Sequence, residues 1–373
     1  MSDIPPRPAA PYGQPPAGGQ VPQAPGAWPQ QPQYSAPPSP EQQFAAQAPA
    51  QPAAQAAPVQ GEAQRAIARV RDEVGKAVVG QNGAVTGLLI ALLARGHVLL
   101  EGVPGVAKTL MVRTFSRAIG LDTKRVQFTP DLMPGDVSGS LIYDARSGEF
   151  EFREGPVFTN VLLADEINRT PPKTQSALLE AMEERQVSAD GVTRPLPDPF
   201  LVCATQNPIE HEGTYSLPEA QLDRFLIKLI VDVPERDSEV SVLRRHADGF
   251  RPRELSEVEP VVTPEEILAA QREADRVTIT DDVLAYIVDL ARATRQSPSV
   301  QVGASPRAST GLLAAAKAWA WLSGYPAVTP DHVQAMIVPV WRHRIQLRPD
   351  AEIEGVSVDA VLNSVLAQTR VPF

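Results

Sequence analysis

The sequence feature that most restricts the possible folds of this chain is a short glycine-containing stretch, EGVPGVAKTL, at residues 101–110. It directly follows the apolar run HVLL and precedes KTLMVRTFSRAIG, in which apolar residues recur at helical spacing. Glycines between a buried strand and a helix, followed by Lys and Thr, match a loop that binds phosphate with backbone N–H groups at a helix N-terminus. A plain tight loop between a strand and a helix is the alternative, and the rest of the sequence decides between the two.

The stretch departs from the strict phosphate-loop pattern at one position. Ala107 stands where the pattern has glycine, and because alanine is compatible with the first turn of a helix we expect the departure to be mild. Lys108 is expected to reach the β- and γ-phosphates, and Thr109 to hold Mg²⁺ through its hydroxyl. The residues expected to line the nucleotide here are Gly102, Val103, Pro104, Gly105, Val106, Ala107, Lys108, Thr109 and Leu110.

A second apolar run, VLLADE, ends in the two acids Asp165 and Glu166. A phosphate loop needs a carboxylate on another strand for the metal, and Asp165 supplies one. Glu166 is expected to orient and deprotonate the attacking water. Two solvated acids at a strand end are the alternative, but together with the phosphate loop upstream the pair favours hydrolysis of ATP with Mg²⁺.

Three further polar residues follow strand or cap signals. Asn207, after the apolar run in FLVCATQNP, is expected to hydrogen-bond the γ-phosphate and position the water. Arg224, in LPEAQLDRF, precedes the next strand and so lies at the opposite edge of the domain, which predicts a finger acting on a neighbouring subunit. The alternative is a surface arginine paired with Asp223 or Glu219.

Arg307, in GASPRA, falls in the first turn of a helix after a Ser305 cap and Pro306. We expect it to close a helical domain onto the γ-phosphate. The alternative is a solvated arginine, although a helix N-terminus is an unfavourable place for a lone cation.

Composition divides the chain into regions. Residues 1–58 contain 16 of the 38 prolines, many Gln, Ala and Gly, and only Asp3, Arg7 and Glu41 as charged side chains. Such a segment buries too little apolar surface to offset its chain entropy, so it is predicted to be a disordered tail with polyproline character. A solvated tail is the simpler interpretation, and contacts with a partner through its aromatic residues are the alternative.

Strands and helices alternate over residues 59–240, which predicts an α/β core with a parallel sheet and helices on both faces. Two hairpins interrupt this alternation. GSLIYDARSGEFEF is expected to turn near Ser147-Gly148 with Phe150 and Phe152 on one face, and RQVSADGVTRPL to turn at Asp190-Gly191. From residue 255 the pattern is helical, which predicts a small helical domain over 255–355 and a C-terminal helix or tail over 356–373.

The whole-chain composition limits the class of protein. The formal net charge of −10 argues mildly against a protein that coats nucleic acid, although a local basic pore in a ring remains compatible with it. The single cysteine, Cys203, excludes an internal disulfide and a cysteine metal cluster, and its apolar surroundings indicate a buried side chain. Without a signal segment or a run of bilayer length, the chain is predicted to be soluble and cytoplasmic, with no membrane span.

The order of these motifs resembles that of the MoxR family of AAA+ ATPases. The resemblance covers about residues 60–350 and rests on EGVPGVAKT, LLADEINR, LLEAMEERQV, ATQNP, EGTYSLPEAQLDRF and GASPRA. It implies an AAA+ core with a helical lid, and the two hairpins correspond to the helix-2 insert and the pre-sensor-1 hairpin of that clade. The alanine in the phosphate loop is itself typical of the family.

The resemblance also implies roles for individual residues. It assigns Walker A to Gly102–Thr109, Walker B to Asp165 and Glu166, sensor 1 to Asn207, the arginine finger to Arg224 and sensor 2 to Arg307. The segment VVGQ, which contains Val79 and Gly80, resembles the segment whose backbone cradles the adenine.

Members of this family are described as chaperone-like ATPases that act with von Willebrand A-domain partners, often in maturation or metal loading of other enzymes. By resemblance we expect a homo-oligomeric ring, a hexamer, with sites shared between subunits, a protein client and no nucleic acid. The alternatives are a motor that moves along nucleic acid, a nucleotide-gated scaffold and a chelatase-like motor subunit.

Overall fold

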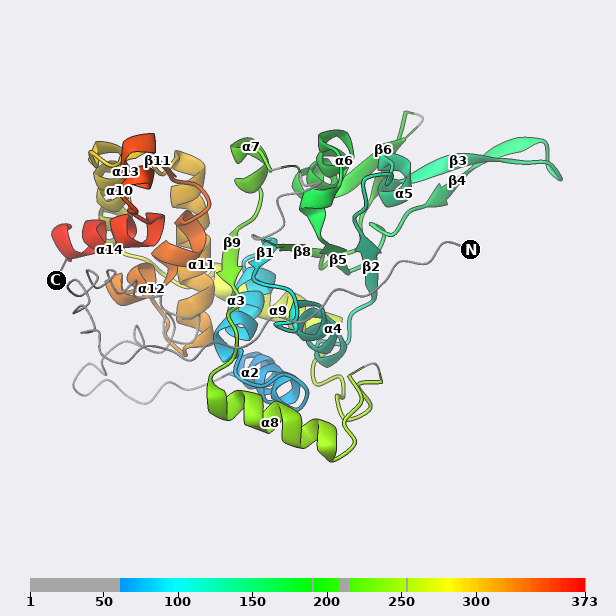
Figure 1. Ribbon diagram of the computed structural model, residues 1–373, viewed down its shortest axis with the longest axis horizontal. Coiled ribbons are helices and arrows are strands. Elements are labelled where there is room, and N and C mark those ends of the chain that lie inside the picture. Colours follow the sequence, from blue (N-terminus) through cyan, green and yellow to red (C-terminus); the bar gives the residue numbers. More distant parts are fainter. Residues whose placement is uncertain (1–60, 190, 208–214, 216, 253, 373) are drawn as a thin grey trace, which may run out of the picture. The chain divides into compact units, whose positions relative to one another are not determined.

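The computed structural model describes residues 61–189, 191–207, 215, 217–252 and 254–372. The tail predicted for residues 1–58 lies outside this range. The described chain contains a parallel five-stranded sheet in the order β2-β5-β8-β1-β9 (Figure 1). Its strands are β1 (Val98–Glu101), β2 (Thr123–Gln127), β5 (Val161–Asp165), β8 (Leu201–Gln206) and β9 (Ile227–Ile230).

The central strands are short, apolar and buried along their length, as strands covered on both faces must be. Alternate side chains enter two separate cores. Cys203 and Leu163 belong to the core under α2 (Glu62–Gly75), α3 (Asn82–Leu93) and α4 (Lys108–Ala118). Ala204 and Leu162 belong to the core under α6 (Pro172–Glu184). The predicted α/β core with helices on both faces is therefore confirmed, and Cys203 is buried as expected.

The register of the sheet brings the ends of its strands to common edges. Glu101 pairs with Gln206, and Gln127 pairs with Asp165, so the carboxyl ends of β1, β8, β5 and β2 meet at one edge. The residues that precede β1 and β9 meet at the other edge, which we call the amino edge. The four-residue strand β1 separates the two edges by about 13 Å.

Both hairpin insertions are present. β3 (Gly139–Asp144) pairs with β4 (Glu149–Glu154), and β6 (Gln186–Ala189) pairs with β7 (Val192–Pro195), each antiparallel. The first turn falls at the predicted position, and Gly148 and Gly191 have positive φ angles of 75° and 70° that favour glycine. Asp190, predicted to begin the second turn, lies outside the described residues. The described chain also has three short helical segments: α5 (Pro134–Ser138), the 3₁₀ turn η1 (Ile167–Arg169) and α7 (Glu219–Leu222).

The second half of the described chain is mainly helical. Thr263 and Ser305 accept the backbone N–H groups of the first turns that follow them, as the sequence predicts. One feature was not predicted: the segment after α10 and the segment after α12 pair as a short antiparallel ladder of two strands, β10 and β11. The elements are α8 (Arg236–Ala247), α9 (Pro264–Asp275), α10 (Asp281–Gln296), β10 (Val300–Val302), α11 (Pro306–Leu322), α12 (Pro330–Trp341), β11 (Gln346–Leu347), α13 (Pro349–Ile353) and α14 (Val358–Gln368).

None of the helices in the described part of the chain has both the length and the apolar character required to cross a membrane. The helical region packs on the core through α11 against α3 and through α12 against β9.

Candidate nucleotide-binding and hydrolysis site

The predicted phosphate loop joins β1 to α4 at the carboxyl edge of the sheet. Gly102 leaves no room for a side chain, because a Cβ there would lie 2.3 Å from the carbonyl oxygen of Val231. The Lys108 ammonium donates to the carbonyl oxygens of Gly102 and, at 3.2 Å, Val103. The lysine therefore lies along its own loop, where phosphate oxygens would compete with these carbonyls for its N–H groups.

The sequence predicted that Ala107 would fit the first turn of α4, but the structure places it outside this turn. It is the residue before the helix and has left-handed φ and ψ angles of 64° and 24°. An alanine there carries strain of about 1–2 kcal/mol because its Cβ approaches the next carbonyl oxygen. The strict pattern has glycine at this position because glycine adopts the conformation freely, so the departure is less mild than expected.

Asp165 lines a polar cavity of about 400 Å³ beside the loop. The Thr109 hydroxyl donates to its Oδ2 atom at 3.0 Å, and the Thr205 hydroxyl donates to its Oδ1 atom at 2.6 Å. Arg125 of β2 donates to the same Oδ2 atom through Nε at 2.9 Å. A hydroxyl and a carboxylate are ligands that Mg²⁺ accepts, so Thr109 and Asp165 fit the metal by the chemistry of their oxygen atoms. Mg²⁺ at Oδ2 would replace the contact that Arg125 makes with this atom.

Glu166 lines the same cavity, and neighbours on two strands hold its side chain and backbone. Its backbone adopts the left-handed conformation, with φ 57°, which turns the chain sharply after β5. Gln127 of β2 donates to its Oε2 atom at 2.7 Å, and Arg169 forms an ion pair with it at 3.1 Å. Its backbone N–H donates to the Thr205 hydroxyl, which also bridges to the neighbouring acid. The carboxylate is thus oriented by the sheet itself.

Asn207 lines the same cavity at the end of β8 and is buried. The structure therefore brings together the loop residues, both acids and this amide, all of which were predicted separately from the sequence.

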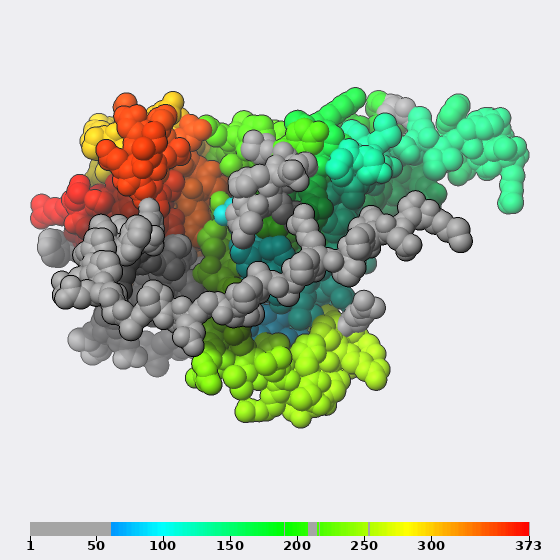
Figure 2. Space-filling view, in the orientation of Figure 1, coloured from blue at the N-terminus to red at the C-terminus, as the bar shows by residue number. Residues whose placement is uncertain are grey.

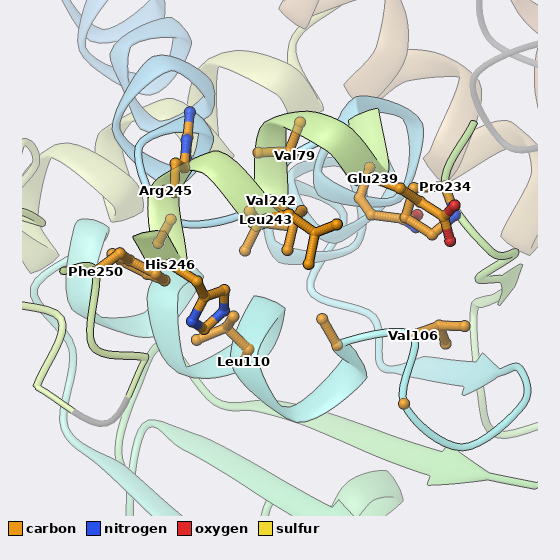
Figure 3. A pocket seen from close by; sticks show the side chains of 15 residues that line it. Val79, Val106, Leu110, Pro234, Glu239, Val242, Leu243, Arg245, His246 and Phe250 are labelled. Carbon is orange, nitrogen blue, oxygen red and sulfur yellow. The ribbon is translucent and has the colours of Figure 1, made fainter. Parts of the chain in front are cut away.

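A second cavity, of about 420 Å³, lies on the other side of the phosphate loop and is mainly apolar. Val79, from the segment predicted to hold adenine, lines it, as does Val106 of the loop, and in Figure 3 Val242 and Leu243 of α8 lie above Leu110 of α4. The phosphate loop borders both cavities. The apolar cavity therefore suits the base of a nucleotide, and the polar cavity suits its phosphates.

The walls of the apolar cavity are tied together by polar contacts. Gln81 donates to the carbonyl oxygen of Asp232 at 3.0 Å, and Arg245 of α8 donates to that of Gly75 at 3.0 Å. Gly80 has a φ of 74°, and a Cβ there would lie 2.9 Å from the Ser238 hydroxyl, so the close approach of α8 requires glycine. Gly80 therefore does not line the cavity itself but allows α8, which lines it, to pack closely.

Arg224 and Arg307 lie together at the amino edge of the sheet, in a different cavity of about 320 Å³. Both contact the carboxylate of Glu183, at the end of α6: Arg224 at 2.8 Å and Arg307 at 2.9 Å. Arg307 therefore does not reach its own phosphate loop, contrary to the expected role of closing the helical domain onto the γ-phosphate. Arg224 lies at the predicted edge, but its partner is Glu183 rather than Asp223 or Glu219.

The arginine pair is part of a larger charged cluster. Asp223 forms ion pairs with Arg307 at 3.5 Å and with Arg344 at 2.8 Å, and the Arg344 side chain is only 5% exposed. The hydrogen bonds from Arg224 and Arg307 lower the pKa of Glu183, so its carboxylate stays ionised. The cluster holds two half-exposed guanidinium groups side by side at a surface.

Comparisons with known proteins identify the family of this chain. The family model described as ATPase family associated with various cellular activities (AAA) matches residues 97–227, and an AAA lid domain model matches residues 292–365. Chaperone MoxR1 of Mycobacterium tuberculosis is 46% identical over 309 residues, covering 80% of this chain and 81% of that protein. The chain belongs to the MoxR family of AAA+ ATPases.

Two other proteins extend the comparison of this MoxR-family chain. The uncharacterized protein YeaC of Bacillus subtilis is 48% identical over 306 residues, which cover 82% of this chain and 95% of that protein. The crystal structure of a candidate ATPase from Cytophaga hutchinsonii is 42% identical with a TM-score of 0.77, and the match covers 83% of this chain and 96% of that one.

Four side chains in the two charged sites of this MoxR-family chain were missed by the sequence analysis: Arg125, Gln127, Thr205 and Glu183. Arg125 and Gln127 alternate along the strand predicted in RVQFTP, so both face the same side, and this period-two spacing could have drawn attention to them. Glu183 carries no comparable signal, because its partners come from distant segments.

Proposed function

We propose that this chain hydrolyses ATP in a ring of identical subunits, with six as the expected number, in which each site is completed by the neighbouring subunit. One observation carries the proposal. Asp165 and Glu166 lie at the carboxyl edge of the sheet, whereas Arg224 and Arg307 lie at the amino edge of the same sheet. One chain therefore offers half of a site at each edge, and a ring joins the two halves.

In this proposal the apolar cavity takes the adenine and the loop backbone takes the phosphates. Thr109 and Asp165 would hold Mg²⁺, which when bound neutralises charge on the phosphates. Glu166 accepts a proton from the attacking water, and Gln127 keeps its carboxylate pointed into the cavity. Asn207 is available from β8 to hydrogen-bond the water or the γ-phosphate.

Arg224 and Arg307 of one subunit would then act on the γ-phosphate bound by the next. Two guanidinium groups on one carboxylate, Glu183, form a preassembled anion site. Phosphate oxygens would compete with Glu183 for their N–H groups. The proposal thus keeps the expected finger role of Arg224 and moves Arg307 from its own site to the neighbour's.

The position of the first hairpin in the chain supports a remodelling role. The segment from α5 through β4 is inserted between β2, which carries Gln127, and β5, which carries Asp165. Gln127 is the last residue of β2, where this insertion begins, so a change in the contact between Gln127 and Glu166 acts on the start of the insertion. We infer chaperone-like remodelling of a protein client, including metal loading, with a von Willebrand A-domain partner; the name of the Mycobacterium tuberculosis relative agrees with a chaperone role.

Mixed rings test the shared site. Lys108→Ala and Arg224→Ala subunits are each expected to lose hydrolysis, the arginine change by about a thousandfold. When the two are co-expressed in equal amounts, about a quarter of the junctions in a random ring join an intact loop to an intact arginine. The rate of hydrolysis should therefore recover to about a quarter of the wild-type rate. Release of inorganic phosphate at saturating ATP measures it.

A matched control mixes Lys108→Ala with Glu166→Gln subunits. Both changes lie at the carboxyl edge, so no junction contains an intact site and hydrolysis should stay absent. If the Lys108→Ala and Arg224→Ala mixture were as inactive as this control, the arginines would not act between subunits and the proposal would fail.

A further inference from the structure

We propose that the tip of the β3–β4 hairpin is a docking surface for a polypeptide segment that is both apolar and positively charged. The inference rests on the proposed remodelling function, because it names the chemistry of the protein segment on which the ring acts.

The register of the hairpin gives it two different faces. Leu141 pairs with Phe152 and Tyr143 pairs with Phe150, so these four side chains share one face, on which the rings of Tyr143 and Phe150 lie 5.4 Å apart. The opposite face carries the alternate residues Ser140, Ile142, Asp144, Glu149, Glu151 and Arg153. One face is therefore aromatic and the other is mainly acidic.

Only the base of the aromatic face is covered. Phe152 contacts the ring of Phe158 edge-on, with centroids 6.0 Å apart, and the guanidinium of Arg194 on β7 stacks over it at 3.9 Å. Towards the tip, Tyr143 is 56% and Phe150 is 67% exposed. The base is thus fixed to the core and to the second hairpin, while the tip presents two uncovered aromatic rings.

The hairpin extends away from the other labelled elements in Figure 1, and Figure 2 shows its end uncovered on the face in view. An isolated two-stranded hairpin is marginally stable in water, and neighbouring exposed aromatics on such an element mark an interaction surface. The aromatic pair therefore gives the tip an apolar anchor site for another molecule.

The charge of the hairpin selects the kind of occupant. Between Gly139 and Gly155 the chain has four acidic residues and two arginines, and Glu149 and Glu151 form no ion pair with another described residue. Unpaired carboxylates beside exposed aromatic rings complement lysine or arginine next to apolar side chains. Phosphate-rich polymers would meet repulsion at the same place.

The chain as a whole carries no excess of positive charge. Its formal net charge is −10, so the surface of a second copy is on average acidic. Residues 1–58 contain only one basic side chain, Arg7, against Asp3 and Glu41. Charge complementarity therefore favours a different, basic polypeptide over a neighbouring subunit or the chain's own tail.

The test uses the full chain carrying Glu166→Gln, with ATP and Mg²⁺, and two fluorescent peptides of equal length and leucine content. One peptide carries lysine and the other glutamate at the positions between the leucines. Fluorescence anisotropy is expected to show that the lysine peptide binds at least about tenfold more tightly. This difference should shrink as salt is added.

Two hairpin variants and their matched controls locate the binding site. Tyr143→Ser with Phe150→Ser should weaken the lysine peptide about tenfold, and Glu149→Lys with Glu151→Lys should reverse the preference to the glutamate peptide. The controls are Ile353→Ser and Glu352→Lys with Glu354→Lys, at the end of α13 and directly after it, where Ile353 is 87% exposed. These changes remove an exposed apolar side chain and two carboxylates outside the hairpin, so the affinities for both peptides should stay unchanged.

Several outcomes would overturn the inference: equal binding of the two peptides, hairpin variants that behave like the controls, or direct binding of a labelled single-stranded oligonucleotide that Tyr143→Ser with Phe150→Ser abolishes, which would make the surface a nucleic-acid site. If one of these occurred while the mixed rings recovered hydrolysis, the docking surface would be wrong and the shared ATPase site would stand. Loss of hydrolysis in the mixed rings would instead count against the proposed function.

Discussion

Acidification should destabilise this protein through histidines that are buried without charge. His97 lies at the amino edge of the sheet and is 4% exposed. Its Nδ1 atom accepts the backbone N–H of Val202 at 3.0 Å, so the ring proton is on Nε2, which donates to the carbonyl oxygen of Met182 at 3.1 Å. Burial lowers the pKa of His97 to about 4. A second proton would break the Val202 contact as well as bury a charge.

The size and sign of the effect follow from this pKa. The unfolded chain protonates His97 near its ordinary pKa of about 6.5, whereas the folded chain resists protonation down to about 4. The folding free energy is therefore unaffected by His97 above about pH 6.5 and becomes less favourable as the pH falls towards 4. The loss is about 2 kcal/mol by about pH 5 and about 3 kcal/mol by about pH 4. Burial also lowers the pKa of His332 to about 4, so it adds a similar loss.

The variant His97→Gln isolates the effect, because glutamine can accept from Val202 and donate to Met182 but does not titrate. Urea unfolding followed by circular dichroism at about pH 7 and about pH 5 should show that the wild type loses about 2 kcal/mol more than the variant between the two. Carboxylates titrate equally in both proteins and cancel in this difference. Equal losses in the two proteins would refute the assignment of His97 as a buried neutral group.

Three substitutions test the phosphate loop and its surroundings. Gly102→Ala should abolish nucleotide binding measured by calorimetry, since a Cβ would lie 2.3 Å from the Val231 carbonyl oxygen; ordinary binding would contradict this. Ala107→Gly should raise the free energy of unfolding by about 0.5–1 kcal/mol, because relief of the left-handed strain exceeds the added chain entropy, and a lower stability in urea would argue against strain. Gln127→Ala should lower kcat by at least about tenfold with little change in ATP affinity, and an unchanged kcat would show that Glu166 needs no such support.

Features coded by neighbouring residues could be predicted from the sequence. Thr263 and Ser305 cap their helices through bonds to residues three positions later. Gly148 and Gly191 supply the positive φ angles of the hairpin turns. The alternation of apolar runs and helical patterns was sufficient for the α/β core because each signal is local in the chain.

Features that depend on distant contacts could not be predicted. Arg125 and Gln127 matter because β2 pairs with β5, and strand order is not written in either segment. The position of Arg307 depends on how the helical region docks on the core, where Arg344 donates to the carbonyl oxygens of Asp223 and Phe225. The left-handed conformation of Ala107 was missed because its residue type favoured the more common helical conformation.

The docking of the helical region also bears on communication around the proposed ring. Arg344 ties α12 to the segment that holds Arg224, and Glu183 ties that segment to Arg307 on α11, so the arginine pair and the helical region form one packed block. The subunit's own nucleotide would instead contact α8, whose side chains close the apolar cavity. Because α8 leads on through the chain to α9, which packs against α11, one helical region adjoins both nucleotides. Hydrolysis at one junction is therefore expected to affect the next junction through this helical region.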